Sequence, residues 1–145
     1  METYQKDLSY FRLRLQELLT TSFPEKTYDF KFIDQRSSWA SYAYEGAFRA
    51  GNPVSQCDHI ADYVLFEGLY LSRFDTVFQV VCNEFDTRMA DEELRPFAFK
   101  MLPVCEPVFT NYKLEDDFAY SSEFELLYTE LTGTIAIWIE ENGLQ

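Results

Sequence analysis

The single histidine of the chain, His59, follows Cys57 and Asp58 in one short stretch. A thiol, a carboxylate and an imidazole could hold a metal ion or form a Cys/His nucleophile pair. On a helix, however, residues two apart point in different directions, and no CxxC, HxxxH or HExxH spacing adds a further ligand. No GxSxG motif provides a serine for a Ser-His-Asp relay. We therefore expect a surface His59 beside a buried Cys57, with no catalytic or metal-binding role.

Carboxylates are the second group of residues that could do chemistry. Four acidic groups occur: Asp91-Glu92-Glu93, Glu115-Asp116-Asp117, Glu123 with Glu125, and Glu140-Glu141. Acid-base catalysis needs two carboxylates in one cleft with separated pKa values, whereas the first and third groups stand where helices are expected to begin. The second group lacks the alternating oxygen ligands and the glycine of a calcium loop. No GxGxxG or GxxxxGK[ST] motif is present, so we predict no cofactor, no metal and no catalytic residue.

The composition suits one folded, acidic domain over residues 1–145. Hydrophobic residues make up 47% of the chain and aromatic residues 18%, which is enough for a single core. The formal net charge of -13 repels phosphate groups, so we expect no direct nucleic-acid binding and no membrane binding. The first residues lack a secretory pattern, and no apolar run approaches the ~20 residues that span a bilayer. Three cysteines, Cys57, Cys82 and Cys105, suit buried thiols in a reducing compartment. A cytoplasmic protein is predicted.

Helical spacing of apolar residues predicts four helices in the first part of the chain. The first spans about Gln5 to Thr21 and the second about Thr27 to Ala50. The second has a wide apolar arc, so we expect it to contact neighbours on more than one side. It ends at Ala50-Gly51-Asn52-Pro53, where glycine suits the helix end, asparagine the next N-cap and proline the first position of the third helix. The fourth helix is expected to begin after Ser72, with acidic Asp75 three positions on.

The next helical pattern contains two prolines. Apolar residues keep a helical period from Asp91 to about Tyr112, but Pro103 and Pro107 interrupt it. Each proline removes a backbone donor and crowds the preceding turn, so we expect two short helices or one kinked helix. Residues 114–120 are expected to form a loop.

The last segment could be a strand or a helix. As a strand, Ile135–Ile139 would place three isoleucines on one face, but the pattern is short and the chain offers hardly any partner strand. As a helix, the segment would begin at Ser122 with Glu125 completing a capping box, and would stop at Asn142-Gly143. We predict the helix because it accounts for more residues.

This helix completes the predicted fold. Leu126 and Ile137 fall on the side opposite its main apolar arc, as either a second buried contact or an exposed patch. We predict an all-α protein, a single compact bundle of about five to seven helices with the C-terminal helix at its centre.

The most distinctive segments are "LSYFRLRLQELL", "VLFEGLYLSRFDTVFQVV" and "LEDDFAYSSEFELLYTELTGTIAIWIEENGL". Through them the chain resembles, over nearly its whole length, the bacterial domain-of-unknown-function family eighteen-ninety-six. Members of that family occur mainly in Bacteroides-type bacteria, often on mobile elements. The resemblance implies an all-helical fold and no known activity, so it supplies no catalytic positions.

Surplus aromatic and acidic residues indicate a function in binding. Tyrosine and tryptophan bring polar groups that need partners when buried, so some are expected at the surface as anchors among carboxylates. The predicted interaction face comprises Trp39, Tyr42, Phe118, Tyr120, Glu115, Asp116 and Asp117. We expect a protein-protein interaction module without catalysis, which binds a basic protein or forms a homodimer. Two alternatives stay open: a DNA mimic that inhibits a basic nuclease or DNA-binding protein, and an enzyme whose pocket forms only in three dimensions.

Overall fold

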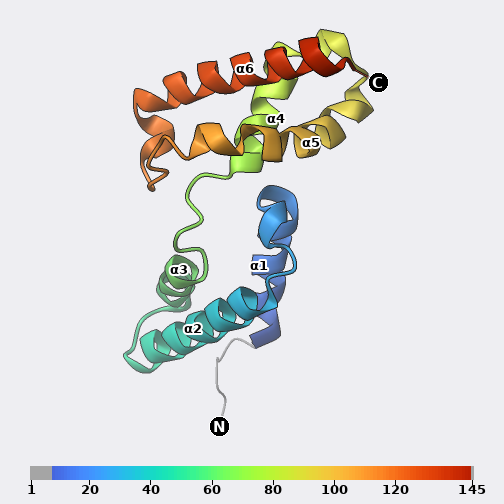
Figure 1. The fold of residues 1–145 in the computed structure, drawn as a ribbon. Coiled ribbons are helices and arrows are strands. Elements are labelled where there is room, and N and C mark those ends of the chain that lie inside the picture. Colours follow the sequence, from blue (N-terminus) through green and yellow to red (C-terminus); the bar gives the residue numbers. More distant parts are fainter. Residues whose placement is uncertain (1–7, 145) are drawn as a thin grey trace. The chain divides into compact units, whose positions relative to one another are not determined.

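The computed structural model describes residues 8–144, and all the regular secondary structure in this range is helical, without a strand (Figure 1). Its elements are α1 (Leu8–Ser22), η1 (Pro24–Lys26), α2 (Phe30–Arg49), α3 (Val54–Leu65), α4 (Arg73–Glu84), η2 (Asp86–Arg88), α5 (Asp91–Phe109), η3 (Phe118–Tyr120) and α6 (Glu123–Asn142). The prediction of an all-α fold with five to seven helices is confirmed. The predicted start of the first helix at Gln5 lies outside the described residues.

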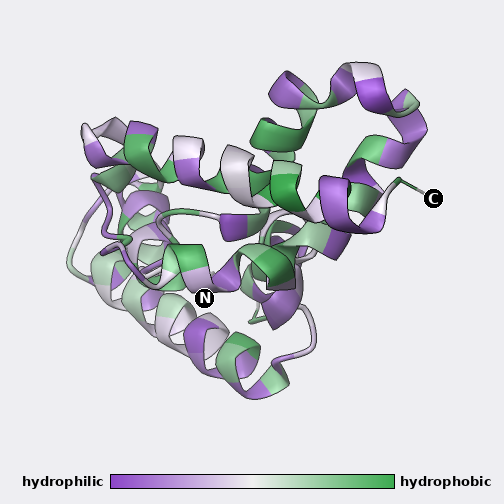
Figure 2. Ribbon diagram, turned by 45° about the horizontal axis from the view of Figure 1, so that its top comes forward, coloured by the Kyte–Doolittle hydropathy of each residue, from purple (hydrophilic) through white to green (hydrophobic). Residues whose placement is uncertain are grey.

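The chain forms two compact units, unit 1 (Met1–Leu69) and unit 2 (Tyr70–Gln145). Each unit has its own cluster of buried hydrophobic residues, from α1, α2 and α3 in unit 1 and mainly from α4, α5 and α6 in unit 2. Hydrophobic and hydrophilic residues alternate along the helical ribbons, the pattern of helices that bury one face (Figure 2). One domain over residues 1–145 stays a prediction.

In unit 1, α2 packs against both α1 and α3, as its wide apolar arc predicted. Its buried residues recur every three or four positions: Ile33, Ser37, Ala40, Tyr44 and Ala47. The facing residues are Phe11, Leu15 and Leu19 of α1 and Cys57, Ala61 and Leu65 of α3. Two alanines on α2 and one on α3 let the helices approach closely, while Phe11 and Tyr44 fill the remaining space with a tilted ring pair 6.3 Å apart.

The turn between α2 and α3 confirms one prediction and corrects two. Gly51 has a φ of +96°, the left-handed conformation that favours glycine after a helix. Asn52 is not the N-cap of α3, because its side-chain Nδ2 donates to the carbonyl of Ala47 at 2.9 Å. Pro53 is the N-cap residue, with an extended ψ of 159°, and not the first residue of the helix as predicted. The helix α3 therefore begins at Val54. The fixed φ of Pro53, -65°, directs the chain into α3 without a side-chain cap.

In unit 2, α4 begins where the sequence predicted. Ser72 is the N-cap, and its Oγ accepts a hydrogen bond from the backbone N–H of Asp75 at 2.9 Å. One of the unpaired donors of the first turn is thereby satisfied. The buried face of this helix consists of Phe74, Thr76, Val77, Val80 and Val81.

The helix α5 runs without a break from Asp91 to Phe109 and contains Pro96, Pro103 and Pro107. Of the two predicted alternatives, two short helices or one kinked helix, the unbroken helix rules out the first, and it ends before Tyr112. Each interior proline costs roughly 3 kcal/mol relative to alanine. Burial of an apolar side chain contributes about 1.5–3 kcal/mol, and five large residues of α5 are buried: Leu94, Phe97, Met101, Cys105 and Phe109. All three prolines are exposed, so the buried face stays intact and its packing outweighs their cost.

The last segment is the helix α6, which confirms the helical prediction over the strand. It buries Leu127, Leu131, Ile135 and Ile139 in the core that it shares with α4 and α5. A central place for the C-terminal helix among all the helices stays a prediction. Gly143 ends the helix with a φ of +78°. Ser122 is the N-cap, but its side chain makes no capping hydrogen bond, so the predicted capping box is wrong. The acidic first turn, with Glu123 and Glu125, offsets the helix dipole instead.

Candidate functional site

The residues predicted to form one interaction face belong to both units. Trp39 and Tyr42 lie on α2 in unit 1, where 49% and 77% of their surfaces are exposed. Tyr120 is 91% exposed in unit 2. Glu115, Asp116 and Asp117 are exposed on the segment before η3. That these residues form a single face stays a prediction.

Phe118 must be removed from that face. It is only 4% exposed and packs in the core of unit 2, with its ring 5.7 Å from Tyr112 and 6.4 Å from Phe124. A phenylalanine in this position anchors the η3 segment to α6. The acidic residues before it are thus presented on a short, fixed loop.

The Cys57-Asp58-His59 stretch is split between core and surface. Cys57 is buried, and its Sγ donates to the carbonyl of Asn52 at 3.6 Å, whereas His59 is exposed on α3. Within residues 8–144, no group of three or more His, Cys, Asp or Glu side chains could hold a metal ion. The positions of Cys57 and His59 agree with the sequence-based expectation.

The other two thiols are held in their protonated form. Burial raises the pKa of Cys105 to about 12, and burial with the nearby carboxylates of Asp86 and Asp91 also raises the pKa of Cys82. The thiolate is the reactive form of cysteine. Neither residue is therefore prepared for nucleophilic chemistry at neutral pH.

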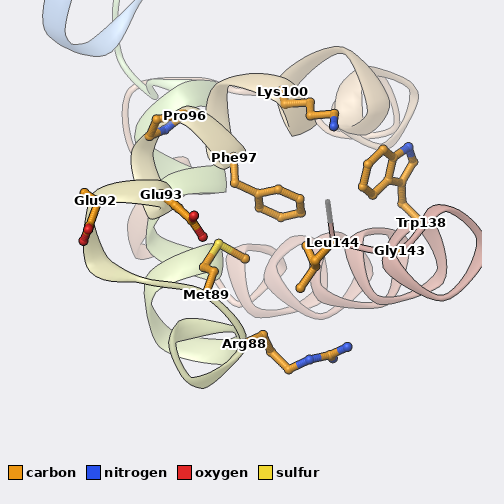
Figure 3. Close-up of a pocket in the computed structure, with 10 residues that line it drawn as sticks. All are labelled: Arg88, Met89, Glu92, Glu93, Pro96, Phe97, Lys100, Trp138, Gly143 and Leu144. Atoms are coloured by element: carbon orange, nitrogen blue, oxygen red, sulfur yellow. The ribbon is translucent and has the colours of Figure 1, made fainter.

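A pocket of about 370 Å³ lies in unit 2 where the first half of α5 meets the end of α6 (Figure 3). We call it the α5–α6 pocket. It is lined by Arg88, Met89, Glu92, Glu93, Pro96, Phe97, Lys100, Trp138, Gly143 and Leu144. Its volume is near the lower end of the range of ligand pockets. Segments that are some forty residues apart in the sequence meet here, because α5 and α6 pack side by side.

An aromatic pair forms the wall of this pocket. The rings of Phe97 and Trp138 meet edge to face, with centroids 5.9 Å apart and an interplanar angle of 63°. Phe97 is almost fully buried, while Trp138 is half-buried and presents a face to the pocket. The ammonium Nζ of Lys100 lies over that ring, 4.9 Å from its centroid (Figure 3). This is a cation-π contact.

Carboxylates and the C-terminal end of α6 give the surroundings of the pocket an excess of negative charge. Asp91, Glu92 and Glu93 form the first turn of α5, and Glu93 accepts a hydrogen bond from the backbone N–H of Ala90 at 3.4 Å. The C-terminal end of α6 has no basic residue in its last turn. Instead it carries the exposed Glu140 and Glu141 beside the carbonyl groups of its last turns, of which those of Trp138 and Ile139 accept hydrogen bonds from Asn142 and Gly143. Since both the dipole and these side chains are negative there, this end of α6 favours a cation.

Unit 2 as a whole also has a negative net charge. Unit 1 has 10 acidic and 7 basic residues, a net charge of -3, whereas unit 2 has 15 acidic and 5 basic residues, a net charge of -10. Most of the acidity of the protein is therefore concentrated in the unit that contains the α5–α6 pocket.

Little in the amino-acid sequence points to this pocket. Trp138 lies within the helical period of apolar residues along α6, which is typical of a core residue, and Phe97 and Lys100 belong to no motif. One signal could have been found: two acidic residues in a helix C-terminus, Glu140 and Glu141, oppose the usual preference for basic residues there. Such a local conflict between sequence and structure is expected at functional sites.

A second, shallower hollow lies in unit 1. It is lined by Leu13, Gln16, Glu17, Thr20, Thr21, Thr27, Tyr28 and Phe30. The three large apolar residues, Leu13, Tyr28 and Phe30, are exposed. Polar threonine and glutamine side chains make up most of the rest, and the rings of Tyr28 and Phe30 meet edge to face.

The fold and the site define a small all-α protein with an acidic surface and an aromatic pocket. The chain belongs to the family described as Domain of unknown function (DUF1896), which it matches over residues 3–144. It is also similar to the "Crystal structure of protein PG0816 from Porphyromonas gingivalis", with a TM-score of 0.89 and 40% sequence identity over 95% of this chain and 94% of that chain. No curated protein matches. The family resemblance seen in the sequence is thus confirmed.

One further finding concerns membranes. No helix within residues 8–144 is long and apolar enough to cross a bilayer. The cytoplasmic location stays a prediction.

Proposed function

We propose that this protein is a binding module that recognises a basic segment of a partner protein through the α5–α6 pocket of unit 2. The observation that carries the proposal is an aromatic pocket wall in a unit with an excess of negative charge. Aromatic anchors bordered by charged residues are typical of the centres of protein interfaces.

Charge supports a basic partner rather than an acidic one. The net charge of -10 on unit 2 attracts a basic segment over a distance of about 8–10 Å, the screening length at physiological ionic strength. Close to the pocket, the acidic first turn of α5 and the end of α6 supply the specific contacts. Long-range attraction raises the association rate, and the aromatic wall adds a place for one side chain to dock.

The test uses fluorescently labelled peptides of matched length that contain lysine, arginine, glutamate or only neutral residues. Binding is followed by fluorescence anisotropy at several salt concentrations. We expect the basic peptides to bind saturably and more weakly at high salt, and the acidic and neutral peptides not to bind. The absence of saturable binding of either basic peptide would refute the proposal.

A matched pair of triple variants separates the site from general charge attraction. Replacing Glu92, Glu140 and Glu141 by glutamine should weaken binding about tenfold, because three carboxylates contribute roughly 0.5 kcal/mol each. Replacing Glu115, Glu123 and Glu125 by glutamine removes the same charge before and at the start of α6, whereas the pocket lies at the other end of this helix. This control should change the affinity by less than about twofold. Equal effects of the two triples would show that the pocket is not the contact site.

Self-association is the second binding mode that a specific observation favours. The face of α6 opposite its core residues exposes Leu126 and Ile137, 60% and 59% accessible, on either side of the exposed Gly133. Light scattering coupled to size-exclusion chromatography measures the mass in solution. A homodimer that Ile137→Asp converts to monomer would place the contact on this face, and a strict monomer would exclude it.

A further inference from the structure

We propose that the α5–α6 pocket receives one lysine or arginine side chain of the partner, and that Lys100 occupies this place in the free protein. This inference rests on the proposed function and deepens it, because it names the chemical group that is recognised. It assigns Trp138 as the platform on which the incoming cation lies.

The first argument is the position of Lys100. Its Nζ lies 4.9 Å from the centroid of the Trp138 ring, and no ion pair holds it among residues 8–144. The remainder of the side chain is exposed on α5. Among the aromatic side chains, tryptophan is the best partner for a cation such as an ammonium group. The pocket therefore already accommodates an ammonium group, and an exposed lysine can leave it readily.

The second argument is that the ring of Trp138 is fixed. Phe97 is buried in the core of unit 2 and meets Trp138 edge to face. The indole of Trp138 lies beside the ring of Phe97. The next residue on α6, Ile139, is also buried. A platform held on two packed helices loses little conformational entropy when a ligand binds.

The third argument is the choice between a cation and an anion. Arg88 and Lys100 line the pocket and could attract an anion, but Glu92 and Glu93 line it as well. The end of α6 adds negative charge from its carbonyl groups and from Glu140 and Glu141. The balance is negative, so a cation is favoured. A lysine or arginine stem also matches the apolar lining from Met89 and Leu144, because such stems pack along apolar surface while the charged group stays solvated (Figure 3).

The experiment uses the emission of Trp138 as a local reporter. The chain has two tryptophans, one in each unit, so Trp39→Phe leaves Trp138 as the only one. The probe is a lysine-containing peptide, compared with the same peptide in which norleucine replaces every lysine. We expect the lysine peptide to change the emission of Trp138 saturably. The norleucine peptide should have no effect, because it keeps the apolar stem but lacks the ammonium group.

Two variants test the roles of the pocket residues. Lys100→Gln should tighten binding of the lysine peptide about two- to fivefold, because it removes a competing cation from the ring. Lys113→Gln removes the same charge from an exposed position of unit 2 outside the pocket and should have a smaller effect. Trp138→Phe keeps an aromatic ring but weakens the cation-π contact, so it should reduce affinity and abolish the gain from Lys100→Gln in the double variant. Circular dichroism melts verify that each variant is folded.

The outcomes separate this inference from the proposed function. The proposed function stands if the basic peptide binds and the Glu92, Glu140 and Glu141 triple variant weakens this binding. The inference is nevertheless wrong if Lys100→Gln changes the affinity no more than Lys113→Gln does and the emission of Trp138 stays constant. If no basic peptide binds, the proposed function itself fails. Saturable binding of the glutamate peptide with a change in Trp138 emission would overturn the choice of a cation.

Discussion

The two units bury helical cores of the same kind but treat their charged residues differently. In unit 1, arginines connect the helices: Arg14 of α1 makes a two-pronged contact with Asp62 of α3 at 2.5 and 3.1 Å. Arg36 of α2 donates to the carbonyl groups of Val64 and Glu67 at the end of α3. Basic side chains thereby offset both an acidic residue and a helix C-terminus, as the helix dipole favours.

In unit 2, most of the carboxylates have no such basic partner. Glu84 and Glu130 accept hydrogen bonds from the hydroxyl groups of Tyr128 and Tyr112, which leaves their negative charge in place. Among the described residues of this unit, one ion pair is seen, between Arg73 and Glu106. The comparison indicates that unit 1 uses its charges to hold its own helices together, while unit 2 keeps negative charge available for a partner.

The largest expected effects come from the separate cores. Leu65 in unit 1 and Leu131 in unit 2 are both fully buried, so replacing either by alanine should lower the free energy of unfolding by about 2–5 kcal/mol. Trp39 reports on unit 1 and Trp138 on unit 2 when the other tryptophan is replaced by phenylalanine. In denaturant titrations, Leu65→Ala should shift mainly the Trp39 transition and Leu131→Ala mainly the Trp138 transition. Identical shifts at both tryptophans would contradict the independence of the cores.

A smaller effect tests the arginine contacts of unit 1. Arg14→Met should lower the free energy of unfolding by about 1 kcal/mol, because the two-pronged contact with Asp62 is half-buried. Arg12→Met removes the more exposed pair with Asp34 in the same unit and serves as the control. Its cost should stay below about 0.5 kcal/mol. Thermal melts of both variants measure the difference, and a larger loss for Arg12→Met would refute this account of unit 1.

Two glycines allow the same substitution in both units. Gly46 of α2 and Gly133 of α6 are exposed within helices, and a Cβ at either position would meet nothing within 4 Å. Alanine at each should therefore raise the free energy of unfolding by about 0.5–1 kcal/mol, through helix propensity alone. Chemical denaturation gives both values. Destabilisation by either alanine would mean that the helix surface around that glycine is more crowded than the structure shows.

The smallest effect concerns pH and unit 2. The hydrogen bond to Glu130 raises the pKa of Tyr112 from its ordinary value of 10.0 to about 12. Its contribution to stability is therefore complete below pH 10 and is lost as the pH rises through about 12, since the unfolded chain releases the proton first. The difference in unfolding free energy between the natural protein and Tyr112→Phe should be constant below pH 10 and shrink above it. A difference that grows above pH 10 would show that this bond does not set the pKa.

Prediction from the sequence succeeded where local pattern decides the structure. The apolar spacing around Leu127, Leu131 and Ile135 predicted α6, and Ser72 predicted the start of α4. It left alternatives open where a local preference competes with packing. Pro103 and Pro107 predicted either two short helices or one kinked helix, and α5 is continuous because its buried face outweighs them.

For the candidate site residues, too, prediction succeeded where the character of a single residue decides its exposure, and failed where tertiary packing decides it. His59 and Tyr42 are exposed and Cys57 is buried, as single-residue character suggested. Phe118 was assigned to a surface because it stands among acidic residues, but its ring fills a space beside Phe124 that is visible only in three dimensions. The α5–α6 pocket was missed for a related reason, since Lys100 and Trp138 meet only when two helices pack.

The sequence by itself determined that the chain is all helical, that it is acidic and where most of its helices lie, because periodicity, end signals and charge are local properties. Tertiary structure alone decided that two cores form, that most of the negative charge belongs to one of them and that an ammonium group rests on Trp138. These features depend on which faces of distant segments come into contact, and side-chain packing sets that choice.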